Sequence, residues 1–139
     1  MIEVHSIDCE VPKIDSELFV LGLERLIVNE SKIVDAINVI CVSDAYLLEM
    51  NIKHLSHDYY TDIITFDYCD GDNVSGDLFV SIDRVIENAS TLGVSPELEF
   101  MRVAVHGVLH LCGYKDKLDE EIAIMRGKED FYLSFCGFT

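Results

Sequence analysis

The amino-acid sequence predicts an α+β fold: a single domain over residues 1–139, with a small mixed four-stranded sheet packed with about five helices. Half of the residues are apolar, which is enough for one hydrophobic core. Short strand-like segments and amphipathic helical segments follow one another in the order β-α-β-α-β-β-α-α-α. No low-complexity tract, linker or repeat divides the chain.

The first four elements are predicted at 1–7, 17–30, 35–42 and 44–50. Residues 1–7 alternate enough to form a strand, and Asp15 and Ser16 can cap the helix that follows. Residues 35–42 are almost continuously apolar, as in a buried central strand. Ser43 and Asp44 can then cap a short helix.

The remaining elements are predicted at 62–68, 76–82, 83–92, 96–112 and 119–135. The turn-rich stretch 68–76 should join the first two of these as a hairpin. Gly93 can end the next helix in a left-handed conformation. Ser95 and Pro96 are a strong start for the helix after it, and Gly113 is a natural end.

The charge of the chain is strongly acidic and unevenly distributed. The formal net charge is −16, of which residues 1–100 carry −15 and residues 101–139 only −1. Such acidity argues against broad non-specific binding to polyphosphates, although it can also simply keep a small protein soluble. The nearly neutral third contains five basic residues: Arg102, Lys115, Lys117, Arg126 and Lys128. An anionic substrate is expected to approach there.

The sequence also indicates the cellular compartment in which the protein is expected. The first ten residues lack the basic start and apolar run of a signal peptide, and no apolar stretch approaches the roughly 20 residues that span a bilayer. The five cysteines are scattered and form no C-x-x-C pair, as in proteins with reduced thiols. We therefore expect a cytoplasmic protein without a membrane partner.

The segment "HGVLHLCGYKD", residues 106–116, carries the strongest chemical pattern. His106 and His110 are four residues apart, so on a helix they project from one face, about 40° apart. A pair of this kind can present two nitrogen ligands to one metal ion. Gly113 can end the helix and allow Asp116 to approach. Two imidazoles and a carboxylate would leave coordination positions open, which is typical of catalytic sites.

This spacing leaves other interpretations open. Two histidines four residues apart are often only hydrogen-bonded or exposed, and Asp116 could cap the following turn while water takes the third position. The metalloprotease motif has a glutamate directly after its first histidine, where this chain has Gly107. The motif therefore argues against peptidase chemistry.

Three segments resemble the YbeY family of single-metal rRNA-maturation endoribonucleases. The segment quoted above is similar to the family's H-G-x-L-H-L-x-G-Y-D-H motif. "NIKHLSHDYYTDIITF" (51–66) resembles N-x-x-x-R-x-K-D-x-x-T-D-V-L-S-F, and "GDLFVSIDRVIENA" (76–89) resembles a G-D-I-x-I-S segment that a helix follows. The three segments come in the family's order and at its spacing, so the resemblance covers most of the chain.

The resemblance implies a single-metal-dependent endoribonuclease that acts in rRNA maturation and ribosome quality control. It implies one Zn²⁺ at His106 and His110, with Asp116 at the position of the family's third histidine ligand. The carboxylate makes the site less positive, so it should lower the pKa of bound water less, and the set also suits Ni²⁺, Fe²⁺ or Mn²⁺. The implied partners are RNA, as single-stranded rRNA ends, and the small ribosomal subunit or its proteins.

One departure from the family concerns the phosphate contact. The family's middle-segment arginine falls on Leu55 here. His57 and Lys53 are the predicted catalytic replacements that hold the phosphate, although polar residues in such a loop are often merely exposed. Three further residues are expected at a strand edge that faces the cleft: Thr61, Asp62 and Thr65.

Two functions besides the nuclease stay open at this point. One is a ribosome-associated assembly or binding factor with little catalysis, which the missing arginine favours. The other is a metal hydrolase of a small phosphorylated or acylated substrate, which the overall acidity favours.

Overall fold

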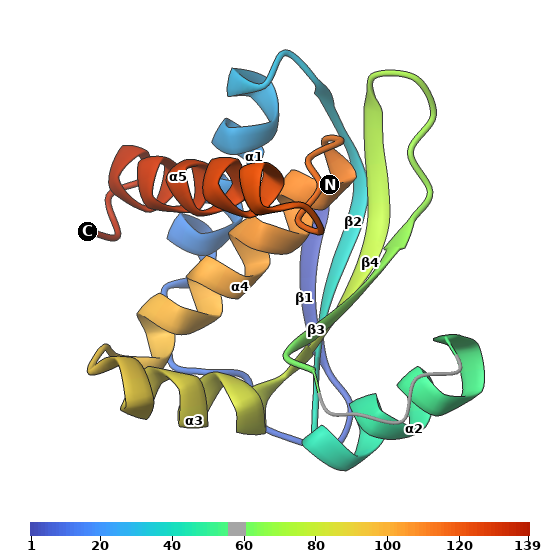
Figure 1. The fold of residues 1–139 in the computed structure, drawn as a ribbon, viewed down its shortest axis with the longest axis vertical. Helices are drawn as coiled ribbons and strands as arrows, with labels where there is room; N and C mark the ends of the chain where they lie inside the picture. The colour runs from blue at the N-terminus through green and yellow to red at the C-terminus, as the bar shows by residue number, and fades with distance from the viewer. Residues whose placement is uncertain (56–60) are drawn as a thin grey trace.

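The computed structural model describes residues 1–55 and 61–139. The described elements are, in order, β1 (Ile2–Ser6), α1 (Ser16–Asn29), β2 (Ile33–Val42), α2 (Asp44–Leu55), β3 (Ile63–Asp67), β4 (Asn73–Ser81), α3 (Ile82–Leu92), α4 (Pro96–Leu111) and α5 (Asp119–Phe135). Within the described residues they form one domain with a four-stranded mixed sheet and five helices (Figure 1). The predicted fold class and element order are confirmed.

The four strands lie in the order β1-β2-β4-β3. β1 pairs with β2 and β2 with β4 in the parallel sense, whereas β3 pairs with β4 in the antiparallel sense and forms an edge. Parallel neighbours require a crossover connection, and α1 supplies it between β1 and β2. β3 and β4 are the predicted hairpin. This order places the start of β3 beside α4, where the two elements are in contact.

Three elements are longer than the sequence predicts. β2 begins at Ile33 and β4 at Asn73, because these two residues pair with each other and extend the parallel ladder beyond the apolar run. α2 continues to residue 55 because no proline or glycine interrupts it. Its last turn carries Lys53, which forms an ion pair with Glu49. The positive charge of Lys53 also interacts favourably with the negative end of the helix dipole.

The helices cover the sheet unequally. α1 and α4 pack on one face, and α5 crosses over α4 on the same side (Figure 1). Phe19 of α1 stacks on Phe100 of α4 with ring centroids 4.9 Å apart, inside the main core. A smaller cluster around Leu47 joins α2 to the other face. α4 therefore has one face in the core, and its remaining face is directed toward α5 and the start of β3.

Both ends of α4 follow the sequence signals. The Ser95 hydroxyl accepts a hydrogen bond from the Leu98 amide at 3.1 Å, and Pro96 opens the first turn. After Leu111, Gly113 adopts a φ of 105°, in the region that favours glycine. The Tyr114 amide then donates to the Leu109 carbonyl at 3.0 Å. The chain is thus turned back along the helix toward its histidine face.

Two further observations concern the cysteines and the helix lengths. All five cysteines are free thiols. Across 1–55 and 61–139, no helix has both the length and the apolar character needed to cross a bilayer.

Candidate metal centre

Three side chains converge beside the C-terminal half of α4. His106 and His110 project from one face of the helix, and Asp116 approaches them from the loop that Gly113 turns back. The two imidazole Nε2 atoms are 3.0 Å apart. Asp116 Oδ2 lies 3.2 Å from Nε2 of His106 and 3.3 Å from Nε2 of His110. We call these three residues the triad.

The triad fits a divalent cation in both size and chemistry. Ligand bonds of about 2.0–2.1 Å in a tetrahedral arrangement place neighbouring donor atoms about 3.3 Å apart, close to the three observed separations. The atoms themselves are electron-pair donors: one carboxylate oxygen and two imidazole nitrogens. Bringing such donors together without a positive charge between them is unfavourable. The triad could therefore hold a metal ion and leave coordination positions for a substrate.

The rest of each imidazole explains why Nε2 is free to bind. His110 Nδ1 donates to the carbonyl oxygen of Tyr114 at 2.9 Å. His106 Nδ1 lies 2.8 Å from Glu129 Oε2 on α5 and donates to that carboxylate. A hydrogen on Nδ1 leaves the lone pair on Nε2, which is directed to the triad centre. Such partners orient metal-binding histidines in many proteins.

Glu129 is the residue of the candidate site that sequence reasoning missed. It belongs to the buried face of α5 and is only 7% exposed, in a series with Met125, Tyr132 and Leu133. An acidic residue at a core position of an amphipathic helix is unusual and was the available signal. Its other oxygen, Oε1, lies 3.5 Å from Arg102 Nη1, so its charge is balanced on both sides.

The electrostatics of the triad reflect these neighbours. Burial alone would lower the pKa of His106, but the hydrogen bond and charge of Glu129, with the charges of Asp116 and Asp62, raise it above the ordinary value. Burial raises the pKa of the Asp62 carboxyl, and the nearby His106 partly opposes this. Negative charge thus surrounds the imidazoles, as a cation site requires.

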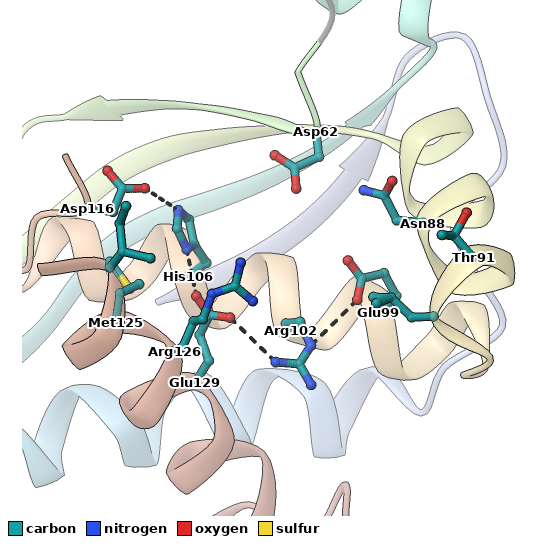
Figure 2. Close-up of a pocket in the computed structure, with 12 residues that line it drawn as sticks. Asp62, Asn88, Thr91, Glu99, Arg102, His106, Asp116, Met125, Arg126 and Glu129 are labelled. Atoms are coloured by element: carbon teal, nitrogen blue, oxygen red, sulfur yellow. Dashed lines mark hydrogen bonds and ion pairs between the residues drawn. The ribbon is translucent and has the colours of Figure 1, made fainter. Parts of the chain in front are cut away.

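Two cavities meet at the triad. The larger, of about 780 Å³, lies along β3 and the loop after α4, and its lining includes both histidines. The smaller, of about 520 Å³, lies between α3, α4 and α5 (Figure 2). Three residues line both: Asp62, His106 and Asp116. A substrate at the triad is therefore accessible from two sides.

The other predicted site residues occupy different positions. Thr61, Asp62 and Thr65 line the larger cavity, as expected of that strand edge. Lys115 and Lys117 line it too. Lys53 is exposed on α2, with Nζ 3.3 Å from Glu49 Oε1, and it is not among the described residues that line either cavity. His57 lies outside the described residues. The phosphate-holding roles of Lys53 and His57 stay predictions.

A second polar cluster supports the loop side of the triad. The Tyr114 hydroxyl donates to Glu30 Oε1 at 2.6 Å, and the Tyr132 hydroxyl donates to the other oxygen of Glu30. Lys128 Nζ lies 3.3 Å from that second oxygen. Glu30 is the C-terminal cap of α1, so this cluster ties α1 and α5 to the residue whose carbonyl orients His110.

The fold and the triad together define a small α+β protein with a candidate open metal site. Comparison with known families identifies the group. The family model described as "Endoribonuclease YbeY" matches residues 6–137. The chain therefore belongs to the YbeY endoribonuclease family, as the sequence motifs predicted.

Individual relatives agree with this assignment. The chain is 48% identical over 116 residues to the endoribonuclease YbeY of Flavobacterium johnsoniae, which covers 84% of each protein. It is 46% identical over 126 residues to that of Flavobacterium psychrophilum, covering 91% of this chain and 89% of the relative. The solution structure of TM1509 from Thermotoga maritima is similar with a TM-score of 0.69 and 30% identity, over 98% of this chain and 89% of the other.

Proposed function

We propose that this protein is a metal-dependent endoribonuclease that cleaves single-stranded rRNA ends during maturation of the small ribosomal subunit. Family membership supports the endoribonuclease activity. The convergence of His106, His110 and Asp116 is the observation that carries the metal dependence. Ribosomal RNA as the substrate would also place the activity in the cytoplasm, where ribosomes are assembled.

The metal in this proposal is one Zn²⁺ per chain, held by the triad. Two imidazoles and a carboxylate also suit Ni²⁺, Fe²⁺ or Mn²⁺, so the identity of the ion is part of the test. When bound, the ion supplies Lewis acidity toward a phosphoryl oxygen of the substrate.

Residues of the chain orient the metal ligands and attract the RNA strand. Glu129 and the Tyr114 carbonyl hold the hydrogens on Nδ1 and thus keep both Nε2 lone pairs directed to the triad centre, where the metal ion would bind. Lys115 and Lys117 line the larger cavity, where their charges offset the acidity of the chain toward an incoming strand. Single-stranded RNA is the favoured substrate because an unpaired strand can bend into such a cavity, whereas a stiff duplex cannot.

His110→Ala tests the proposal directly. We expect the variant to lose its bound metal and its cleavage of single-stranded rRNA fragments together, because one of three ligands is gone. Metal content by mass spectrometry and cleavage by gel assay are measured on the same preparations. The control is His5→Ala, which removes an imidazole that bonds Asn38 on the opposite part of the sheet.

The outcomes separate the proposal from its rivals. Cleavage that persists in metal-free His110→Ala would rule out the metal-dependent mechanism. A wild type that carries metal, cleaves no RNA and still associates with small-subunit particles would make the protein an assembly factor instead. Metal without either RNA activity or ribosome association would indicate a small-molecule hydrolase.

Asp116→His tests the third ligand. Imidazole can replace the carboxylate as a ligand, so metal content should stay near one ion per chain. The site gains one positive charge, which favours the deprotonated form of water held there, so the cleavage optimum should shift to lower pH. Complete loss of metal from this variant would refute Asp116 as a ligand position.

A further inference from the structure

The smaller cavity extends away from the triad and is not needed to hold a metal ion. Its volume of about 520 Å³ lies within the range of small-molecule sites, roughly 300–1,000 Å³. α3, α4 and α5 wall it, and the walls combine apolar with polar side chains. Apolar surface comes from Leu92, Ile122 and Met125, and polar groups from Asn88 and Thr91. Such mixed walls suit a ligand with both a flat apolar part and hydrogen-bonding edges.

The position of this cavity relative to the triad is informative. An internal cut in a strand leaves a nucleotide on each side of the scissile phosphate. The strand must therefore continue in two directions from the metal. The larger cavity supplies one direction, along β3, and the smaller cavity supplies the other, since Asp62, His106 and Asp116 line both.

Two arginines line the smaller cavity, and they differ in their partners. Arg102 has carboxylate oxygens of Glu99, Glu129 and Asp130 within 3.6 Å, so its charge is already matched by the protein. Arg126 is exposed on α5 and makes no ion pair with any carboxylate in the described part of the chain. Figure 2 shows its guanidinium among the lining side chains near His106. A guanidinium fork matches the geometry of a phosphate group.

An unsatisfied acceptor lies in the same cavity. Glu99 Oε1 is buried and has no hydrogen-bond partner among the described residues, although Arg102 Nε is 3.6 Å away. The Glu99 side chain is only 5% exposed. A buried acceptor of this kind needs a donor. A nucleotide brings such donors, a ribose 2′-hydroxyl and base amino groups, besides its phosphate.

We propose that the cavity between α3, α4 and α5 binds the RNA nucleotide on one side of the scissile phosphate, and that Arg126 contacts its phosphate. The inference rests on the proposed function and names a substrate subsite of that same site. Glu99 accepts a hydrogen bond from the ribose or the base of the bound nucleotide.

Arg126→Gln tests the phosphate contact in the metal-loaded enzyme. Loss of a charge-assisted hydrogen bond should raise KM for single-stranded RNA about tenfold, with little change in kcat. The affinity for a short single-stranded RNA oligonucleotide, measured by fluorescence anisotropy at low temperature before cleavage, should fall by a similar factor. The slope of log affinity against log salt should become shallower by about 0.7, as for one lost phosphate contact on a single strand.

Arg25→Gln is the matched control, because it removes the same charge from an exposed arginine on α1 that does not line the cavity. Arg126→Lys keeps the charge but loses the fork, so its KM should lie between those of wild type and Arg126→Gln.

Thr91→Glu tests the cavity independently of Arg126. The new carboxylate stands at the cavity wall and should repel the phosphate, raising KM and weakening oligonucleotide binding. Ser90→Glu adds the same charge at the neighbouring exposed position of α3, which does not line the cavity. Both substitutions lie in the last turn of the helix, so they affect its stability similarly.

Failure of the proposed subsite and failure of the proposed function give different results. If wild type cleaves RNA while Arg126→Gln and Thr91→Glu match their controls in KM, affinity and salt slope, the subsite is refuted and the proposed function stands. If wild type neither binds nor cleaves RNA when fully loaded with metal, both fail. Parallel losses in Arg126→Gln and Thr91→Glu, absent from both controls, support the subsite.

Discussion

The α5 side and the loop side of the triad hold their histidines by different means. His106 donates Nδ1–H to a carboxylate that α5 supplies, whereas His110 donates to the backbone carbonyl of Tyr114. The carboxylate adds a negative charge and can be removed by substitution. The carbonyl is neutral, and every residue type at 114 would provide it. One imidazole thus depends on a specific side chain, and the other depends on the path of the chain.

This difference predicts that metal affinity is more sensitive to substitutions on the α5 side than on the loop side. Glu129→Gln keeps the size of the side chain but removes its charge, so metal affinity should fall about 10–100-fold, as for other residues that orient a metal-binding histidine. Competition with a chromogenic chelator measures this. Asp130→Asn is the control, because Asp130 also pairs with Arg102 but contacts neither histidine. Equal affinities for the two variants would contradict the comparison.

Substitutions on the loop side should instead lower the stability of the folded protein. Burial alone would raise the pKa of Glu30, but hydrogen bonds from Tyr114 and Tyr132 and the charge of Lys128 lower it below its ordinary value. Glu30→Gln should therefore reduce the free energy of unfolding by about 2 kcal/mol near neutral pH, since hydrogen bonds to a charged group are lost. Urea denaturation measures the change, with the exposed Glu10→Gln as control.

The pH dependence of this effect has a definite sign. Because the pKa of Glu30 is lower in the folded state, its stabilisation is fully present above the unfolded value of about 4.3. It is lost as the pH falls through the folded value. Wild type and Glu30→Gln should therefore converge in stability under acidic conditions. A difference that grows on acidification would show that Glu30 does not act as a charged acceptor.

Tyr114→Phe should give the smallest change. It removes the hydroxyl that donates to Glu30 and keeps the carbonyl that accepts from His110. Stability should fall by about 1 kcal/mol, and metal affinity should stay close to that of wild type. A metal affinity as low as that of Glu129→Gln would mean that the loop position depends on the tyrosine side chain, which would remove the distinction between the two sides.

Local signals in the sequence account for most of the fold and for the triad. The period of the helix places His106 and His110 on one face, and the glycine that ends the helix brings Asp116 back. These relations act over ten residues or fewer. The strand order β1-β2-β4-β3 is not local, and the sequence predicted only a mixed sheet.

The partners of the triad could not be found from spacing. Glu129 reaches His106 only because α5 packs across α4, and Glu30 reaches Tyr114 from the end of α1. Neither contact has a fixed separation along the chain. The acidic residue on the buried face of α5 was the one visible sign. A backbone acceptor such as the Tyr114 carbonyl leaves no sign in the sequence at all.

Gly107, between the two histidines, shows why this helix does not suit peptide hydrolysis. It is buried against the sheet, and a Cβ there would lie 2.8 Å from Ile63 Cδ1 and 3.0 Å from Leu78 Cδ2. A glutamate at this place would bring its carboxylate among aliphatic side chains, facing away from any bound ligand. A glutamate in place of Gly107 would thus supply no general base at the triad, unlike the glutamate of the metalloprotease motif.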